Sequence, residues 1–142
     1  MKLNITFNDD KDIGNYTNIH LSSKTYKQEL QEVPKESCEH ILITDAINRV
    51  EESEAIEVID LSLRCLKNGG NVTISMVDFN TLCTAHSSGN IDHEIMNGIV
   101  STSQCVIEYP VILQAFAKHN VKLVSSKSTS LLYTIDGNKD AS

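Results

Sequence analysis

Two aspartates stand directly after apolar segments that have the pattern of buried strands. Asp45 follows the run at 41–44, and Asp78 follows the alternating apolar residues at 72–76. In open α/β sheets, ligands bind in the crevice beyond the carboxyl ends of the strands, where a carboxylate can orient a substrate or accept a proton. Asp45 and Asp78 are therefore the candidate catalytic residues. Each also has a structural interpretation, because aspartate is common in tight turns and as a helix cap.

Histidine and acidic residues also gather between residues 80 and 103, at His86, Asp92, His93 and Glu94. Imidazole and carboxylate groups serve as general bases and as metal ligands. Their spacing matches no zinc pattern, and Cys83 with His86 supplies only a single sulfur and nitrogen pair. We therefore expect no metal site in this chain.

The elements that would position these residues follow from apolar periodicity and from turn residues. Strands are predicted at 2–7, 16–21, 41–44, 72–76, 122–126 and 131–135. Helices are predicted at 26–31, at 53–67, as a short turn at 80–84, and from Pro110 to Asn120. The rest of 80–103 is expected to be irregular. The run at 41–44 is typical of a strand that is buried on both faces of a parallel sheet.

The predicted helix at 53–67 has the clearest signals. Its apolar stripe repeats at helical spacing and comprises Ile56, Ile59, Leu63 and Leu66. Ser53 is placed to cap this helix, and Gly69-Gly70 is placed to end it in a left-handed conformation. We therefore expect Ile59 and Leu63 to be almost fully buried.

The alternation of strands and helices, followed by two adjacent strands, indicates an α/β fold. We predict a single Rossmann-like three-layer domain over 1–136, with a mostly parallel sheet and a C-terminal antiparallel hairpin. The strands at 2–7, 41–44 and 72–76 should be parallel neighbours. Residues 137–142 are polar, and we expect them to form a flexible tail.

Composition narrows the range of partners and compartments. The chain has 142 residues, of which 40% are hydrophobic, and this is enough for one core. Its net charge is −7 without any basic run, so nucleic-acid binding is not expected. No signal peptide and no membrane-spanning run is recognisable. The four cysteines are widely spaced, as is typical of reduced thiols. We expect a cytoplasmic protein with a small-molecule ligand.

The segment at 41–79 resembles the later half of a class I S-adenosylmethionine-dependent methyltransferase. In that family a strand and a helix lead through a Leu-Lys-Pro-Gly-Gly turn into another strand, and here residues 66–70 read Leu-Lys-Asn-Gly-Gly. Residues 1–21 are similar to the start of a compact subgroup, which opens with Leu-Asn-hydrophobic-Gly-Cys-Gly and continues with Trp-hydrophobic-Asn-hydrophobic-Asp. The helix near Pro110 and the last two predicted strands fit the C-terminal end of the family.

The sequence departs from this family pattern in two places. Family members hold the methionine part of the cofactor on a glycine-rich loop after the first strand, but residues 5–10 contain no glycine. Their second strand ends in an acid that binds the ribose hydroxyls, and His20 stands there instead. The cofactor-binding positions that the resemblance implies are Thr6, Asn8, Asp9, Gly14, His20, Thr44 and Ala46.

Two functions are compatible with these features. The resemblance implies a small methyltransferase that uses S-adenosylmethionine on a small molecule or sugar acceptor, with Asp45 and Asp78 near the reacting group. The altered cofactor positions favour a catalytically inactive domain of the same fold. Such a domain would bind or scaffold, with a protein partner, as a homo-oligomer or in a larger assembly.

Overall fold

The computed structural model describes residues 1–140 of the chain, which form one mixed sheet with helices. The strands are β1 Lys2–Thr6, β2 Thr17–His20, β3 Cys38–Thr44, β4 Leu66–Val77, β5 Val121–Thr129 and β6 Leu132–Lys139. The helices are α1 Tyr26–Glu32, α2 Glu52–Arg64, α3 Phe79–Ser87, α4 His93–Thr102 and α5 Tyr109–Lys118. Two short 3-10 turns, η1 Asp9–Lys11 and η2 Ile47–Arg49, follow β1 and β3.

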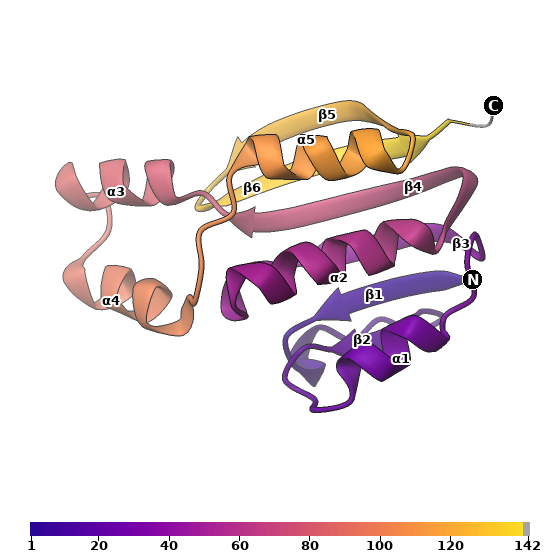
Figure 1. The fold of residues 1–142 in the computed structure, drawn as a ribbon. Coiled ribbons are helices and arrows are strands. Elements are labelled where there is room, and N and C mark those ends of the chain that lie inside the picture. The colour runs from indigo at the N-terminus through magenta and orange to yellow at the C-terminus, as the bar shows by residue number, and fades with distance from the viewer. Residues whose placement is uncertain (141–142) are drawn as a thin grey trace.

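The strand order in the sheet is β2-β1-β3-β4-β6-β5. Strands β2, β1, β3 and β4 run parallel, and β6 and β5 add an antiparallel hairpin. Leu3 pairs with Ile41 and Ile41 with Val72, so the three strands predicted as parallel neighbours are confirmed. The predicted α/β domain with a mostly parallel sheet is therefore confirmed. The parallel strands all end at the edge that faces α3 and α4 in Figure 1.

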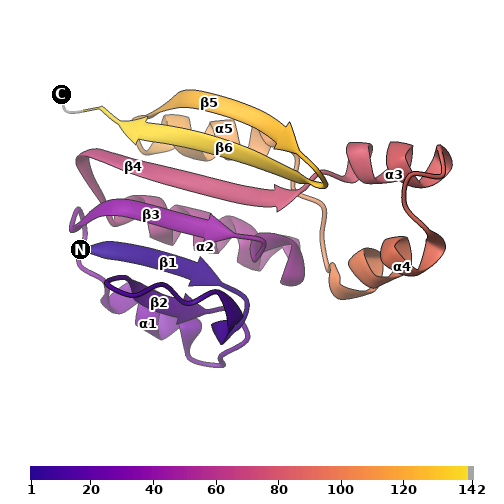
Figure 2. The same cartoon turned by 180° about the vertical axis from the view of Figure 1, so that it is seen from behind.

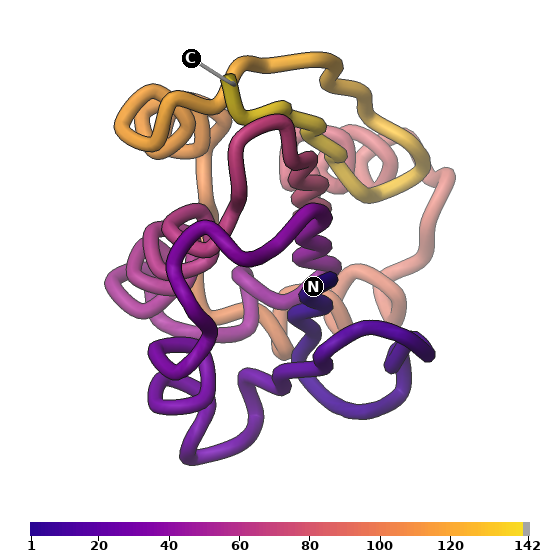
Figure 3. Tube along the Cα trace, turned by 90° about the vertical axis from the view of Figure 1, so that its right-hand side faces the viewer, coloured from indigo at the N-terminus to yellow at the C-terminus, as the bar shows by residue number. Residues whose placement is uncertain are grey.

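The helices that cover the sheet lie on one of its faces. Helices α1, α2 and α5 stand in front of the strands in Figure 1, behind them in Figure 2, and together on the left in Figure 3. Within residues 1–140, the second face carries only the β1–β2 connection at residues 7–16. The second helical layer of the expected three layers is reduced to this segment, because it is short and lacks an apolar stripe.

The second face of the sheet is polar, and its side chains bond across neighbouring strands. Thr73 Oγ1 donates to Asp136 Oδ1 at 2.6 Å. The hydroxyl oxygens of Ser75 and Thr134 lie 3.2 Å apart. Leu42 on this face is only half-buried, so the predicted burial of β3 on both faces is not confirmed. No helix covers the strand there in the part of the chain described.

Helix α2 lies at the centre of the core. Ile59 is 1% exposed and Leu63 is 0% exposed, which confirms the predicted burial of both. Ile56 is 39% exposed, however, and Ala55 and Val58 are buried in its place. The buried face of α2 therefore includes Ile59 and Leu63 as predicted, but it extends toward Ala55 and Val58 and leaves Ile56 at its edge.

The predicted ends of this helix need correction. α2 begins at Glu52, so Ser53 lies inside its first turn and does not cap it. The helix ends before β4 starts at Leu66, so Gly69-Gly70 lies within β4 and does not stop the helix. Gly69 has a φ of +80°, a conformation that glycine adopts without strain.

The segment at 80–103 is largely helical, whereas mostly irregular chain was expected. Asp92 Oδ1 accepts a hydrogen bond from Ile95 N at 2.9 Å and so caps α4. Gly89, with a φ of +80°, separates the two helices. Helices α3 and α4 form an arm that projects beyond the carboxyl edge of the sheet (Figure 1).

The C-terminal hairpin is longer than the predicted strands and uses a tighter turn. Ser130, with a φ of +59°, lies in the turn that joins β5 to β6. Strand β6 runs to Lys139, so residues 137–139 of the predicted tail belong to the sheet. Residues 141–142 of that tail lie outside the described residues. Gly137 is buried against Val121 and Phe116. Because glycine has no apolar side chain, it does not extend the alternating pattern from which a strand is predicted.

Gly137→Ala should lower the free energy of unfolding by about 1–3 kcal/mol because it overpacks the core. A Cβ atom at position 137 would lie 2.6 Å from Val121 Cγ1 and 2.7 Å from Phe116 Cε2. Urea unfolding followed by circular dichroism measures the loss. Gly14→Ala is the matched control, because nothing lies within 4 Å of a Cβ at position 14. Equal stability of the two variants would contradict the close packing of Gly137 against Val121 and Phe116.

Leu63→Ala should lower the free energy of unfolding by about 2–5 kcal/mol, the usual range for a truncated core leucine. The same unfolding measurement tests it. Ile56→Ala on the same helix is the control, and its effect should be clearly smaller because Ile56 is 39% exposed. A loss below about 1 kcal/mol for Leu63→Ala would show that α2 presents another face to the sheet.

Candidate functional site

Two asparagines hold the segment after β1, residues 7–16, against the sheet. Asn4 is 1% exposed, and its Nδ2 donates to Lys11 O at 3.1 Å and to Asn18 Oδ1 at 2.8 Å. Asn18 Oδ1 also accepts from Ile13 N at 3.1 Å, and Asn18 Nδ2 donates to Ile13 O at 3.1 Å. Buried amide groups require such partners. The bonds therefore fix the segment beside the strands β1 and β2.

The predicted binding residues of this segment bond to the segment itself. Thr6 is 2% exposed, and its Oγ1 donates to Asn8 O at 2.8 Å. Asn8 precedes η1, where its Oδ1 accepts from Asp10 N at 3.3 Å. Asp9 and Gly14 are exposed. Asn8 Oδ1 thus takes up the N–H of Asp10, one of the backbone donors that a phosphate- or cofactor-binding loop would present to its ligand.

His20 ends β2 and pairs with an acidic residue from the 7–16 segment. Its Nε2 lies 2.6 Å from Asp12 Oδ1. Thr6 and His20 are neighbours in the sheet register, so this pair lies at the carboxyl edge. The imidazole at the predicted ribose position already has a carboxylate partner.

Asp45 is the centre of an ion cluster beyond the end of β3. Its Oδ2 lies 3.2 Å from Arg49 Nη2 and 3.8 Å from Lys11 Nζ. The Arg49 guanidinium also lies over the Phe7 ring, 5.5 Å from its centroid, a favourable cation–π geometry. The cluster ties the 7–16 segment to the loop after β3. It surrounds the predicted catalytic carboxylate with two cations.

The neighbours of Asp45 are part of the framework. Thr44 pairs with Ser75 in the sheet register. Ala46 is 0% exposed and packs in the core. Ala46 therefore presents no surface to a ligand in this conformation.

Asp78 caps helix α3. Its Oδ1 accepts from Thr81 N at 3.0 Å, and its Oδ2 accepts from Ser128 Oγ at 2.7 Å and from Thr81 Oγ1 at 2.8 Å. Partial burial raises the pKa of the Asp78 carboxyl, but the hydrogen bonds from Ser128 and Thr81 outweigh burial and hold the pKa below its ordinary value. The structural interpretation of Asp78 as a capping residue is confirmed.

The two candidate catalytic carboxylates have different bonding partners. Asp45 and Asp78 follow the neighbouring strands β3 and β4. Asp45 pairs with Lys11 from the β1 side of the sheet, whereas Asp78 bonds to Ser128 of β5. Each carboxylate is therefore engaged by its own surroundings.

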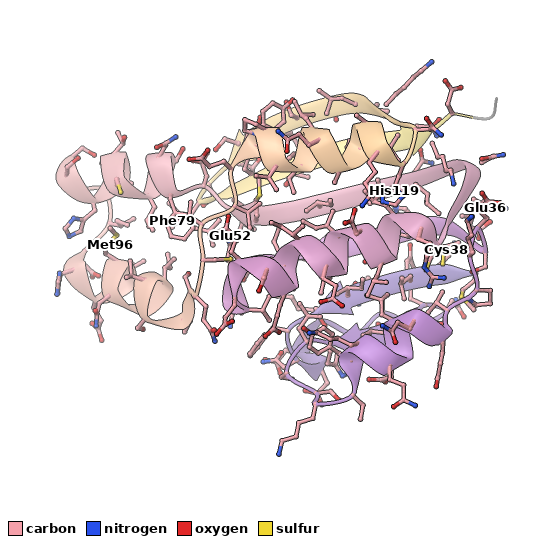
Figure 4. The ribbon with its side chains drawn as sticks, in the orientation of Figure 1. Glu36, Cys38, Glu52, Phe79, Met96 and His119 are labelled. Carbon is pink, nitrogen blue, oxygen red and sulfur yellow. The ribbon has the colours of Figure 1, made fainter. Side chains whose placement is uncertain are left out.

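A cleft of about 510 Å³ opens where β4 ends. The end of β4, the start of α3, the start of α5 and strand β6 form its walls. Tyr109 and Tyr133 line it as an edge-to-face pair with ring centroids 5.5 Å apart. Asp78 and Glu108 add carboxylates to the lining. Figure 4 shows Phe79, another lining residue, where α3 leaves the sheet.

Sequence reasoning found Asp78 but missed most of this cleft. Its lining residues come from three stretches that are far apart in the chain, 76–81, 106–110 and Tyr133, and no local pattern connects them. Asn48 supports the cleft: its Oδ1 accepts from Val77 N at 2.8 Å, and its Nδ2 donates to Cys105 O at 3.2 Å. Asn48 is 1% exposed. Its supporting role was missed because an asparagine shortly after a strand is typical of an ordinary turn.

Across residues 1–140, no group of three or more histidine, cysteine, aspartate or glutamate side chains is arranged to hold a metal ion. The ring centroids of His86 in α3 and His93 in α4 lie 6.1 Å apart. None of the helices described has the length and apolar character to cross a membrane.

The three-dimensional arrangement has many relatives among solved structures. An S-adenosylmethionine-dependent methyltransferase from Mesorhizobium loti matches with a TM-score of 0.63 and 9% identity, over 97% of this chain and 90% of that one. The chain has the class I methyltransferase fold. No protein-family model and no curated protein matches its sequence.

Two further matches share this methyltransferase fold. A structure of the complex between the Haloferax volcanii Trm112 methyltransferase activator and the putative methyltransferase gives a TM-score of 0.61 at 12% identity, over 98% and 82% of the two chains. An O-methyltransferase family protein from Burkholderia thailandensis gives 0.58 at 15% identity. That match covers 90% of this chain, which spans only 37% of the Burkholderia protein.

Asp78→Ala should lower the free energy of unfolding by about 0.5–2 kcal/mol at neutral pH, because α3 loses its cap. The pKa of Asp78 is lower in the folded chain than in the unfolded one. Its stabilisation is therefore complete above the unfolded value of about 3.9 and is lost as pH falls through the folded value. Urea unfolding of both proteins should show the difference narrowing below about pH 4. An unchanged difference in acid would contradict this role of the ionised carboxylate.

Proposed function

We propose that this chain is a catalytically inactive binding domain of the methyltransferase fold, which acts with a partner or within a larger assembly. We infer that it does not hold S-adenosylmethionine at the carboxyl ends of β1, β2 and β3. The observation that carries this proposal is the 7–16 segment, whose backbone is held against the sheet by hydrogen bonds with the side chains of Asn4, Thr6 and Asn18 in β1 and β2. The same edge would have to receive the cofactor.

The residues at this edge do not fit the cofactor. Asp45, a carboxylate that could meet the sulfonium or ammonium charge of S-adenosylmethionine, already pairs with Arg49 at 3.2 Å and with Lys11 at 3.8 Å. His20 is engaged by Asp12 at 2.6 Å, so a ribose hydroxyl would have to compete with a carboxylate for it.

A domain without catalysis acts through its surface, and the arm formed by α3 and α4 offers such a surface. In the described chain α4 has no buried residue, and Ile95 and Val100 are each 48% exposed. A ten-residue helix is marginally stable without packing. The Haloferax complex with an activator is a precedent for protein partners of this fold, and we extend it to this chain as part of the proposal.

The second candidate function is a methyltransferase that acts on a small molecule or sugar. The observation that favours it is the cleft at the end of β4, which lies beside the strand ends and contains Asp78. This function requires cofactor at the strand ends. His20→Ala should then weaken binding several-fold, while His119→Ala, at the C-terminal end of α5 beside Asp60 of α2 and away from the carboxyl edge (Figure 4), should leave it unchanged.

Calorimetric titration with S-adenosylmethionine and S-adenosylhomocysteine separates the two candidates. We expect no binding at the 7–16 segment at about 1 mM of either compound, which corresponds to less than about 4 kcal/mol of affinity. If heat is observed, changes in the amide chemical shifts of residues 7–16 show whether the compound binds at this segment. Thermal shift measurements under the same conditions provide a second readout.

A triple variant tests whether the side chains at these positions prevent cofactor binding. Thr6→Gly, Asn8→Gly and His20→Asp together restore the family pattern at the positions that the resemblance aligns. If side chains at these positions prevent binding, the triple variant should gain affinity while retaining the folded circular dichroism spectrum. Binding by the wild type that shifts the amides of 7–16 and is lost in His20→Ala would overturn the inference that this edge does not hold the cofactor and would favour the methyltransferase candidate.

A further inference from the structure

We propose that the cleft at the carboxyl end of β4 binds a small organic cation, such as a protonated or quaternary amine. Its volume of about 510 Å³ lies within the range of about 300–1,000 Å³ that is usual for small-molecule sites. The cleft lies toward β6 and α5, whereas the Asp45 cluster lies toward β1. The inference rests on the lining of this cleft and does not require S-adenosylmethionine at the ends of β1, β2 and β3.

The charge of the cleft has one sign. Asp78 and Glu108 are the charged residues of its lining, and no lysine, arginine or histidine is among the lining residues described. The chain as a whole has a net charge of −7. A cleft with low-dielectric walls and only negative charge concentrates cations and repels phosphates and carboxylates.

The two carboxylates have different roles in this site. Asp78 uses its oxygens to accept hydrogen bonds from Thr81 and Ser128, so it contributes negative charge from a fixed position. Glu108 precedes α5 without making a side-chain cap bond. Within residues 1–140 the Glu108 carboxylate has no hydrogen bond or ion pair, which leaves it available to a ligand. Glu108 is therefore the direct partner of the cation.

The aromatic pair explains why the ligand is organic. Tyr109 and Tyr133 line the cleft from α5 and β6, and both are half-buried. Ring faces attract cations, by about 0.5–1 kcal/mol at exposed sites and about 2 kcal/mol or more when the cation is desolvated. Val106 and Pro110 add apolar surface to the same lining. Methyl groups on an ammonium nitrogen would contact this surface, which a hydrated metal ion would not.

The fold positions these groups rigidly. Tyr133 pairs with Met76 across β4 and β6, and Met76 is 3% exposed in the core. Ile107, between Val106 and Glu108, is 4% exposed and belongs to the same core. The backbone of the cleft wall is thus held by buried neighbours, while the exposed Glu108 side chain can turn toward a ligand.

The test compares choline with 3,3-dimethyl-1-butanol, which has the same shape without the charge. Titration of the wild-type chain is followed by ¹H–¹⁵N correlation spectra. Choline should shift the amides of 76–81, 106–110 and 133 and bind at least about fivefold more tightly than the alcohol, as expected for about 1 kcal/mol of cation attraction. Equal affinity for the two compounds, or shifts outside the cleft, would overturn the proposal.

Variants assign the effect to named residues. Glu108→Gln should reduce choline affinity at least about fivefold and leave the alcohol unchanged. Glu94→Gln, which removes a carboxylate from the first turn of α4 outside the cleft, is the matched control and should change neither. Tyr133→Leu should weaken choline binding, and Tyr133→Phe should preserve it because the ring remains. Unchanged choline binding in folded Glu108→Gln would contradict the site as described.

Discussion

The side-chain amide of Asn4 is the constraint on which the carboxyl edge depends. Asn4 lies on the sheet face that has no helical layer, yet it is 1% exposed, so its amide needs partners within the chain. The 7–16 segment supplies them through Lys11 O and Asn18. Because the segment is held there, Lys11 reaches Asp45 and Asp12 reaches His20. One buried amide thus accounts for the closed state of the region where this fold would receive its cofactor.

The two faces of the sheet are stabilised in different ways. Helices α1, α2 and α5 cover one face with an apolar core, while the other face has hydrogen-bonded polar side chains such as Thr73 with Asp136. A polar face needs no second helical layer, since antiparallel and mixed sheets can be solvated on one side. The features open to partners consequently lie on the β4 side, in the arm of α3 and α4 and in the cleft beside Tyr109.

The parts of the fold that the sequence predicts are those with a local pattern. Alternation in β4 and the stripe that includes Ile59 and Leu63 come from burial on one face, and both are confirmed. Helix α4 was missed because its apolar residues meet no core, although Asp92 was a readable cap. The pairing of Asp45 with Arg49 was not predicted, although the two residues are four positions apart. Local sequence patterns could not predict the cleft, because Tyr109 and Tyr133 come together only in the folded chain.

The central claim is that the 7–16 segment is held closed against the sheet, and amide hydrogen exchange tests it most directly. Ile13 N donates to Asn18 Oδ1, and Leu21 N and Ser22 N donate to Thr6 O and Phe7 O. These three amides should be protected in the free chain, and millimolar S-adenosylhomocysteine should leave their exchange rates unchanged. Fast exchange of Ile13 N in the free chain, or a change in its rate on addition of the nucleoside, would contradict the account.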